Sequence, residues 1–548
     1  MIQRFRWCVC ALLWVVAACG GSRCDGGSGS PAPKTTPAQE IAVAIPKPDL
    51  RLLLLTDPRG YLEPCGCNQR PLGGVDKLAT VVARAKRDGV PLLVFSAGDF
   101  AVGTELRAED AEQARAQELM RANTFVEAYK QLGVTAIAPG ALDLAQSARL
   151  LGELAARGGY PWIVDNASVP DGKPSPFAQA RIVEVSGIKV GVLGLVAPPA
   201  APIDKELTLQ GDLGAIAAAK SSELRAEGAQ LVIALVSADR RSARSIAGKG
   251  PDLVLMGGLD LERPLPPSVL GSAVLLHAGY QGQNVVTVDL GLKAAADKQD
   301  WEDASAWSRR ALHKDLDQQI AERRASMRAW EKDPKVAKAD LDAQRARLRE
   351  LESERERTSK PSFAGRWLNA ELVELAPEIP DDPTLAKQLE AHDVQVNEHN
   401  RTSLAGLKPL PAEPGKAAYA GSESCASCHQ QAYDWWRGTK HGRAYATLER
   451  VHKEFNLNCV SCHVTGYNEK GGSTVTHVDR LKDVGCETCH GPGSQHNAAP
   501  KQPGLIALAV PESVCGGCHT KEHSDRFVYD AFRQMLIVPG HGRPADRQ

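Results

Sequence analysis

Short apolar runs alternate with stretches of helical periodicity between residues 49 and 292 of this chain. The apolar runs are too short for buried helices and are rich in Leu, Val and Ile, which predicts buried strands. The predicted strands are Leu52–Leu55, Leu92–Phe95, Val190–Val196, Leu231–Val236, Leu253–Met256 and Val285–Leu290, and the predicted helices include Val75–Arg87, Ala111–Leu132 and Gly214–Glu227. Strands that alternate with helices indicate a layered α/β sheet. None of these helices is preceded by a glycine-rich phosphate-binding loop.

The pattern changes between residues 293 and 418, where we predict a helical hairpin followed by a linker. Apolar residues recur at nearly helical spacing on both sides of Asp333-Pro334, and the proline is expected to break the helix there. These residues are Leu312, Leu316, Ile320, Met327 and Trp330, then Leu341, Leu348 and Leu351. The hairpin is either a solvated spacer or a dimerising coiled coil, and its repeat is short and irregular for a coiled coil. A further helix is expected around Leu385–His399.

The first nineteen residues have the pattern of an export signal. Arg4 and Arg6 precede an apolar run that ends at Ala18, and this run is too short to span a bilayer comfortably. The run ends in Val16-Ala17-Ala18-Cys19, which resembles a bacterial lipobox, so cleavage before Cys19 would make that cysteine the lipid-bearing first residue. A plain signal peptide with an incidental cysteine, or a short anchor, is the alternative. Residues 20–48, rich in Gly, Ser, Pro and Ala, are typical of a flexible tether.

The C-terminal region contains four copies of C-x-x-C-H, the attachment pattern of c-type haem. They are Cys425-Ala-Ser-Cys428-His429, Cys459-Val-Ser-Cys462-His463, Cys486-Glu-Thr-Cys489-His490 and Cys515-Gly-Gly-Cys518-His519. In this pattern two thiols form thioethers to one porphyrin, and the next histidine ligates its iron. Structural zinc is the alternative for paired C-x-x-C, but zinc does not explain a histidine after every pair. The pattern predicts four haems held by eight cysteines.

Composition limits the remaining possibilities. A formal net charge of −1 shows no basic bias, so nucleic acid is not an expected partner. Of the 14 cysteines, eight belong to the haem motifs and three lie at or before Cys19, which leaves Cys24, Cys65 and Cys67. An odd remainder is not expected to form a disulfide framework.

Residues 419–548 resemble the tetrahaem cytochrome c-554 family. The resemblance rests on Tyr419-Ala420-Gly421-Ser422, on Trp435-Trp436-Arg437-Gly438-Thr439-Lys440-His441-Gly442-Arg443-Ala444-Tyr445-Ala446, and on the residues that follow the second and third motifs, through His496. It implies a mainly helical and irregular multihaem domain. It also implies three haems with two histidine ligands and leaves room for one five-coordinate haem.

The sixth ligands can be approached from the residue inventory. Low-spin electron-transfer haems take Met or His as sixth ligand, and this region has only Met535 but six spare histidines: His441, His452, His477, His496, His523 and His541. Histidine is therefore the expected distal ligand. The family pattern favours His441, His496 and His541, while His452 and His477 are weaker candidates. His523 follows His519 too closely to reach another iron.

Residues 49–292 resemble the bacterial 5'-nucleotidase type of metallophosphoesterase. The resemblance rests on Leu54-Leu55-Thr56-Asp57 with Gly60, on Leu72-Gly73-Gly74-Val75-Asp76, on Phe95-Ser96-Ala97-Gly98-Asp99, and on the later runs 164–167, 189–195 and 228–235. It implies a four-layer α/β/β/α sandwich. No counterpart of that family's separate substrate-binding domain is found.

The metal ligands implied by this resemblance are mostly replaced. Those enzymes hold two metals about 3.5–4 Å apart to activate water. Only Asp57 and Asp99 are retained; other residues stand where the family has His or Asn, namely Arg59, Ala141, Leu142, Ser237 and the run Gly257-Gly258-Leu259-Asp260. Two carboxylates cannot fix a dinuclear site, so we expect a degenerate domain. Alternatively, both are ordinary Asp residues at strand ends.

The segment Glu63-Pro64-Cys65-Gly66-Cys67 follows the first predicted strand. Two close thiols beside a carboxylate could form a disulfide, bind a soft metal or do thiol redox chemistry. An inert cysteine pair in a Gly/Pro loop is the alternative. If the resemblance holds, Glu63, Cys65 and Cys67 adjoin Asp57 and Asp99 in a remodelled site.

These observations predict an exported multihaem cytochrome, anchored by lipid in the periplasm or at the outer membrane, that exchanges electrons with redox partner proteins. The phosphoesterase-like domain would be a docking or binding module. One alternative is an oxidoreductase that acts on a small nitrogen compound at a five-coordinate haem. Another is an active metal-dependent phosphoesterase, which the missing ligands oppose.

Overall fold

The computed structural model describes residues 44–64, 70–103, 111–170, 173–200, 202–259, 261, 263–293, 300–521 and 523–536. Contacts divide the chain into a short unit, Met1–Ala44, and a compact unit, Ile45–Gln548. The second unit contains all the elements below. Cys19, Cys65, Cys67 and His541 lie outside the described residues, and so does most of the predicted tether.

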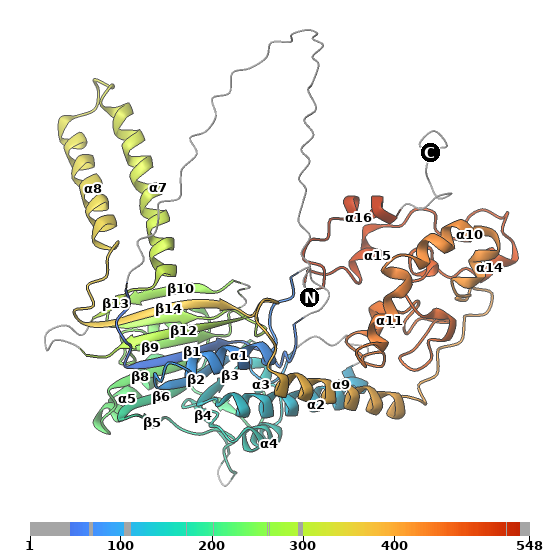
Figure 1. Cartoon of the computed structure of the whole chain (residues 1–548), viewed down its shortest axis with the longest axis horizontal. Coiled ribbons are helices and arrows are strands. Elements are labelled where there is room, and N and C mark those ends of the chain that lie inside the picture. Colours follow the sequence, from blue (N-terminus) through green and yellow to red (C-terminus); the bar gives the residue numbers. More distant parts are fainter. Residues whose placement is uncertain are drawn as a thin grey trace, which may run out of the picture. The chain divides into compact units, whose positions relative to one another are not determined.

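Two mixed sheets of six strands each organise the first part of the described chain (Figure 1). The first sheet has the order β13-β14-β12-β1-β2-β3, with β13 (Trp301–Asp303), β14 (Arg366–Glu374), β12 (Asn284–Gly291), β1 (Leu50–Thr56), β2 (Leu92–Gly98) and β3 (Ala136–Pro139). The second has the order β10-β11-β9-β8-β6-β5, with β10 (Leu265–Leu270), β11 (Ala273–His277), β9 (Leu253–Gly257), β8 (Leu231–Ser237), β6 (Ile188–Val196) and β5 (Arg181–Val185). Strands β4 (Ala167–Ser168) and β7 (Thr208–Leu209) form a small pair.

The sheets pack face to face, and helices cover their outer faces. In β1, Leu52 and Leu54 lie in the core between the sheets, whereas Leu53 and Leu55 lie in the core beneath the helices. This explains the continuous apolar run, because a strand buried on both faces needs apolar residues at every position. The covering helices are α1 (Val75–Lys86), α2 (Ala111–Leu132), α3 (Ala141–Leu144), α4 (Ala148–Gly158) and α9 (Pro383–Ser403) on the first sheet, and α5 (Leu213–Ala226) and α6 (Arg240–Ile246) on the second. The predicted α/β/β/α sandwich is confirmed.

The sandwich continues beyond residue 292, where the sequence predicted a hairpin, a helix around Leu385–His399 and a linker; α9 confirms that helix. Strand β14 pairs antiparallel with β12 from Asn284↔Glu374 to Gly291↔Trp367, and β13 pairs with β14. Helix α9 packs on α1 and α2. Residues 293–418 therefore complete the first sheet and its helical cover.

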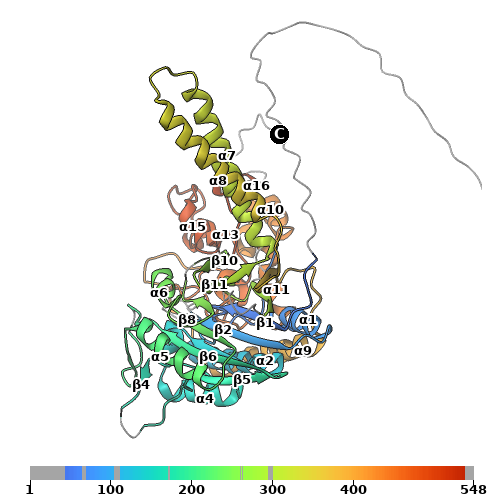
Figure 2. The ribbon, with the colours of Figure 1, turned by 90° about the vertical axis from the view of Figure 1, so that its left-hand side faces the viewer.

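The helical hairpin lies between β13 and β14 in the chain. It consists of α7 (Ala306–Trp330) and α8 (Lys338–Arg357), and it turns at the predicted Asp333-Pro334. Its small core contains Leu316, Ile320 and Leu351. Figures 1 and 2 show the two helices side by side, with their connecting loop at the end away from the sheets. No described helix is both long and apolar enough to cross a membrane.

Residues 419–536 form short helices joined by irregular segments, as the sequence predicted. They are α10 (Glu423–Arg437), the 3₁₀ turn His441–Arg443, α11 (Ala444–Glu449), α12 (Val460–His463), the turn Asp479–Leu481, α13 (Cys486–His490), α14 (Ser494–Ala498), α15 (Glu512–Gly516) and α16 (Tyr529–Leu536). One small apolar cluster, which includes Tyr445, Val460 and Val475, also takes in Ala114 from α2. Such a small core fits a region in which bound porphyrins supply apolar packing surface.

Candidate functional site

Each C-x-x-C-H motif lies on a helix or begins at its N-cap, as Cys459 does before α12. In α12 and α13 the histidine is the last helical residue, and α15 ends just before the last Cys and His of its motif. Helix α10 continues past its motif, but His429 has non-helical torsions (φ −122°, ψ 41°) that kink it. Positions three apart share a helix face, so the two thiols can reach one ring while the histidine leaves the helical path. All eight cysteines are free of disulfides.

Three of the motif histidines form hydrogen bonds through Nδ1, two with a backbone carbonyl and one with a hydroxyl group. His463 Nδ1 donates to the Ala444 carbonyl at 2.7 Å, and His490 Nδ1 donates to the Ala507 carbonyl at 2.6 Å. His519 Nδ1 lies 3.0 Å from Ser524 Oγ. A proton fixed on Nδ1 leaves the Nε2 lone pair for a metal, and such outer contacts orient metal-binding imidazoles. The neutral tautomer that iron ligation needs is therefore fixed at His463 and His490, whose partners are carbonyl oxygens that can only accept.

Two spare histidines each lie opposite a motif histidine. The ring centroids of His429 and His496 are 6.4 Å apart, and those of His441 and His519 are 6.1 Å apart. Two imidazoles on opposite faces of one metal have centroids about 6 Å apart, because each metal–nitrogen bond is about 2 Å and the ring centre lies about 1 Å further. The residues therefore fit haem iron between each pair. The sequence favoured His496 and His441 but could not assign them to particular motifs.

The other spare histidines are placed differently. Both ring nitrogens of His477 have polar neighbours, Lys408 Nζ at 3.0 Å and Thr476 Oγ1 at 3.0 Å. His523 Nδ1 contacts Thr520 Oγ1 at 2.8 Å, and His452 is exposed at positive φ. Met535 is 71% exposed, which leaves it no buried ligand role here. Among the described residues no second histidine ring faces His463.

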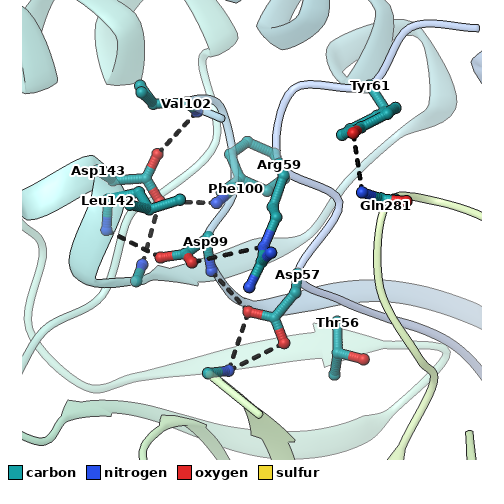
Figure 3. A network of polar contacts seen from close by, with 12 residues as sticks. Thr56, Asp57, Arg59, Tyr61, Asp99, Phe100, Val102, Leu142, Asp143 and Gln281 are labelled. Atoms are coloured by element: carbon teal, nitrogen blue, oxygen red, sulfur yellow. Dashed lines mark hydrogen bonds and ion pairs between the residues drawn. The ribbon is translucent and has the colours of Figure 1, made fainter. Parts of the chain in front are cut away.

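The retained Asp57 and Asp99 meet at the ends of β1 and β2, where Figure 3 shows their contacts. The Asp57 carboxylate accepts N–H bonds of 2.9 Å from both Asp99 and Gly258. Burial, and then the charge of Asp99, raise the pKa of Asp57 to about 7 in spite of these donors. Asp99 accepts the Leu142 N–H at 2.9 Å and lies 3.6 Å from Arg59 Nε. Protein donors therefore surround both carboxylates.

Asp143 is a third buried carboxylate that the sequence analysis missed. It accepts backbone N–H bonds from Phe100 at 2.7 Å, Ala101 at 2.9 Å, Val102 at 3.2 Å and Gly140 at 3.1 Å. Burial, with the nearby Asp99 charge, raises its pKa to about 7. An acid three residues after Gly140, at the third position of a helix, is a capping signal that could have revealed it. Its role is to hold the loop after β2.

Arg59 occupies the position next to Asp99 where a metal-binding side chain was expected. Its guanidinium also lies 5.9 Å from the centre of the Tyr280 ring. The backbone around the carboxylates is tightly packed, because a Cβ on Gly98 would lie 2.0 Å from Asp57 Oδ1 and one on Gly140 would lie 2.3 Å from the Asp99 nitrogen. Within the described residues, no three His, Cys, Asp or Glu side chains are grouped so that they could hold a metal.

Glu63 does not lie with Asp57 and Asp99 but contacts the haem-motif region. It pairs with Lys453, whose ammonium also lies 3.1 Å from Asp393 of α9. Gln117 of α2 adds to this junction, because its Oε1 accepts N–H bonds from Asn400 at 2.7 Å and from Leu457 at 3.1 Å. The segment that precedes the second C-x-x-C-H motif is thus fixed to the sandwich. No sequence pattern indicated this junction.

A protein-family model and a known relative match the region that contains the C-x-x-C-H motifs. Residues 424–491, which include three of the four motifs, match the family model "Cytochrome c554 and c-prime". A cytochrome c-554 from Nitrosomonas europaea is 37% identical over 93 residues, which are 14% of this chain and 40% of the relative. The chain therefore spans less than half the length of that relative. The match implies covalent c-type haem in this region.

Solved structures similar to this chain include phosphoesterases. A 5'-nucleotidase precursor from Thermus thermophilus is 16% identical with a TM-score of 0.42, and the match covers 66% of this chain and 61% of that one. A calcineurin-like phosphoesterase from Bacillus subtilis is 13% identical with a TM-score of 0.43, covering 65% of this chain and 99% of that one.

Proposed function

We propose that this chain is an exported multihaem c-type cytochrome that transfers electrons through four covalently bound haems. The observation that carries the proposal is the pair of imidazole couples, His429 with His496 and His441 with His519, at separations suited to an intervening iron. An iron with two histidine ligands exchanges electrons without binding a substrate, and histidine in place of methionine favours a low reduction potential.

The residues of the chain have separate tasks in this proposal. Bound haem supplies one-electron chemistry. The eight motif cysteines anchor the rings, and His429, His463, His490 and His519 provide the proximal nitrogens. The carbonyls of Ala444 and Ala507 accept the Nδ1 protons of His463 and His490 and fix the orientation of these rings. His441, His496 and, outside the described residues, His541 provide distal nitrogens.

The sandwich serves in this proposal as a docking or binding module and not as a hydrolase. The saturation of Asp57, Asp99 and Asp143 by backbone N–H groups and Arg59 supports this view. A two-metal hydrolase needs carboxylates that are open to metal and water. The junction at Lys453 and Gln117 gives the module a fixed attachment next to the second haem motif, where a redox partner could be positioned.

A second function is favoured by the surroundings of His463. No second imidazole faces it among the described residues, and His541, which lies outside them, is expected to serve only one further haem, so the haem at Cys459 and Cys462 is one candidate for five-coordination. An open iron position would allow an oxidoreductase reaction on a small nitrogen compound. In that case the other haems would carry electrons to or from this one.

Electron paramagnetic resonance of the oxidised protein, combined with a haem count, tests the proposal. Four haems per chain, all low spin and inert to nitric oxide and cyanide, would support the carrier. One high-spin haem that binds these ligands would support the oxidoreductase. Fewer than four haems would contradict the tetrahaem assignment.

Export and lipid anchoring complete the proposal and rest on the lipobox-like run that ends at Cys19. Replacing Cys19→Ser should move the protein from the membrane fraction to the soluble periplasm. The fractionation is best done in about 0.5 M salt, where surface charge contacts are screened. An unchanged distribution under these conditions would contradict the lipid anchor.

A further inference from the structure

The hairpin tip, defined as residues 328–338, is the end of α7, the connecting loop and the start of α8. Figures 1 and 2 both show it at the end of the hairpin away from the sheets. The core between the helices, formed by Leu316, Ile320 and Leu351, does not extend into it. The tip therefore presents its side chains to the surroundings without covering any described part of the fold.

Positive charge is concentrated at this tip. Arg328, Lys332, Lys335 and Lys338 are exposed, and among the described residues none of them forms an ion pair. Of the two acids in the tip, Glu331 pairs with Arg345 at 2.9 Å and Asp333 accepts the Lys335 backbone N–H at 2.9 Å.

Farther from the tip, several hairpin arginines form ion pairs. Arg324 pairs with Glu352 on the facing helix, and Arg355 pairs with Asp317 at 2.9 Å. Acidic and basic residues are nearly equal in number along the shaft, whereas the tip has four cations and only two acids, Glu331 and Asp333. Four cations without counter-ions are not needed to hold the two helices together, so a role in binding an anionic surface is the simplest physical reason for them.

Trp330 is the one large aromatic residue of the tip. It is the last residue of α7 and is 37% exposed, although the sequence pattern placed it in the stripe between the helices. Tryptophan is favoured where a ring meets both lipid and water, since its body is apolar and its N–H is polar. An exposed tryptophan surrounded by lysine and arginine is the combination found at interfacial membrane contacts.

We propose that the hairpin tip docks on the surface of an anionic phospholipid bilayer, with Trp330 at the headgroup level and the four cations against lipid phosphates. A lipid surface fits better than a protein, because a specific protein interface buries about 800 Å² on each partner, and the tip is a single loop with one aromatic side chain. Protein side chains make this contact, so it does not require the proposed lipid on Cys19. Together the two contacts would hold the hairpin end of the sandwich against the membrane.

Vesicle flotation of the full-length, haem-loaded Cys19→Ser protein tests this docking without the acyl chain. Vesicles of phosphatidylcholine alone are compared with vesicles that contain about 30% phosphatidylglycerol, in about 0.05 M and about 0.5 M salt. We expect binding to the anionic vesicles at low salt and at least tenfold weaker binding at high salt. Binding to the phosphatidylcholine vesicles, which carry no net charge, measures any association through the N-terminal segment.

Two tip variants and one matched control make the test specific. Neutralising the tip cations (Arg328→Gln, Lys332→Gln, Lys335→Gln and Lys338→Gln) should weaken binding to anionic vesicles at least tenfold, and Trp330→Ala should weaken it severalfold. The control removes the same charge from exposed positions on or just after α6 (Arg240→Gln, Arg241→Gln, Arg244→Gln and Lys249→Gln) and should leave binding unchanged.

The proposal is overturned if the unmodified tip gives no binding to anionic vesicles, or if tip and control variants lose binding equally. Cross-linking of the tip to an acidic protein, with no binding to vesicles, would overturn it in favour of a protein partner. The substituted positions are exposed, so unchanged haem absorbance and circular dichroism are expected in every variant.

Discussion

The ammonium group of Lys453 lies 3.1 Å from the carboxylate of Asp393 and also pairs with Glu63. One cation from the haem region is thus held between two acids of the sandwich. Burial disfavours the charged ammonium, but the charges of Glu63 and Asp393 outweigh it and raise the pKa of Lys453. Lys453 is therefore charged at neutral pH, and it ties the segment before the second haem motif to α9.

Replacing Lys453→Met should destabilise this junction by about 2 kcal/mol, because it leaves two carboxylates facing each other without a cation. The value is below that of a fully buried pair, since the Glu63 side chain is 36% exposed. Lys470→Met is the control, as Lys470 pairs with Glu413 on the surface and should contribute less than about 1 kcal/mol. Denaturant unfolding measures the difference, and hydrogen exchange of residues 453–460 should increase in the first variant alone. Equal effects of the two substitutions would contradict the junction's importance.

Asp393 should make stability depend on pH between about 4 and about 7. Burial, then the charge of Glu63, raise the pKa of Asp393 from 3.8 to about 7. The folded state then binds more protons than the unfolded state within this window, so stability falls as pH rises through it and levels off above. His392, beside Asp393, has its pKa lowered to about 4 by burial, so its own contribution to stability rises with pH over this window and opposes that of Asp393.

Comparison with Asp393→Asn isolates this contribution. Asp57 and Asp143, whose pKa values are also raised to about 7, change stability in the same direction, so the slope of the unmodified protein alone is not diagnostic. The Asn variant keeps those two groups and loses only the Asp393 proton. Relative to the unmodified protein, it should be more stable at pH 8 than at pH 5. Parallel stability–pH curves for the two proteins would show that Asp393 does not titrate in this window.

The sequence predicted the parts of the fold that depend on local pattern. The run at β1 is apolar at every position because Leu53 and Leu54 face different cores, and α7 and α8 have helical periods separated by Pro334. Strand β14 was not predicted because its sequence, RWLNAELVE, has no continuous apolar run: Asn369 lies between buried Leu368 and Ala370, and Glu371 follows. Its pairing with β12 is a long-range relationship with no local signal.

The candidate sites also have some features that follow from local sequence and others that depend on tertiary contacts. Spacing alone predicted the haem cysteines and proximal histidines. Which spare histidine faces which motif depends on tertiary contacts, as in the pairing of His441 with His519. Glu63 and Lys453 are 390 residues apart, so no sequence pattern relates them. Asp143 was missed because the family motif points to Asn and His ligands and not to a carboxylate that accepts backbone N–H bonds.

The distal-ligand assignment predicts specific spectral changes. His441→Ala and His496→Ala should each convert one haem from low spin to high spin without loss of covalent haem, because the cysteines still hold the ring. His541→Ala should do the same for a third haem. We also expect mostly negative midpoint potentials and no Met–iron charge-transfer band, since Met535 is exposed.

Two histidines provide matched controls for these variants. His477 and His523 are occupied by polar neighbours, so His477→Ala and His523→Ala should leave all spin states unchanged. Paramagnetic resonance gives the spin states, and haem absorbance after denaturation gives the covalent haem content. If His441→Ala leaves every haem low spin, then His441 is not the partner of His519.

The phosphoesterase-like site should be inactive, because its carboxylates are engaged by the protein itself. The purified chain should hydrolyse neither nucleotides nor nitrophenyl phosphate in the presence of manganese or zinc. Asp99 faces Arg59 and the Leu142 N–H, and replacing it by Asn should therefore change no activity. Turnover that disappears in Asp99→Asn would show a working metal site.

The same geometry predicts that these acids act in stability. Asp143 accepts four backbone N–H bonds, and an amide in its place offers one acceptor oxygen and turns its NH₂ group toward some of those donors. Asp143→Asn should therefore cost about 2–3 kcal/mol, since buried donors left without an acceptor cost about 1–3 kcal/mol each. Asp239→Asn on α6 is the control: it also accepts backbone N–H bonds, but it is exposed and caps only that helix, so about 1 kcal/mol or less is expected. If Asp143→Asn costs no more than this control, the carboxylate does not hold the loop after β2, and a different reason is needed for an acid buried at that position.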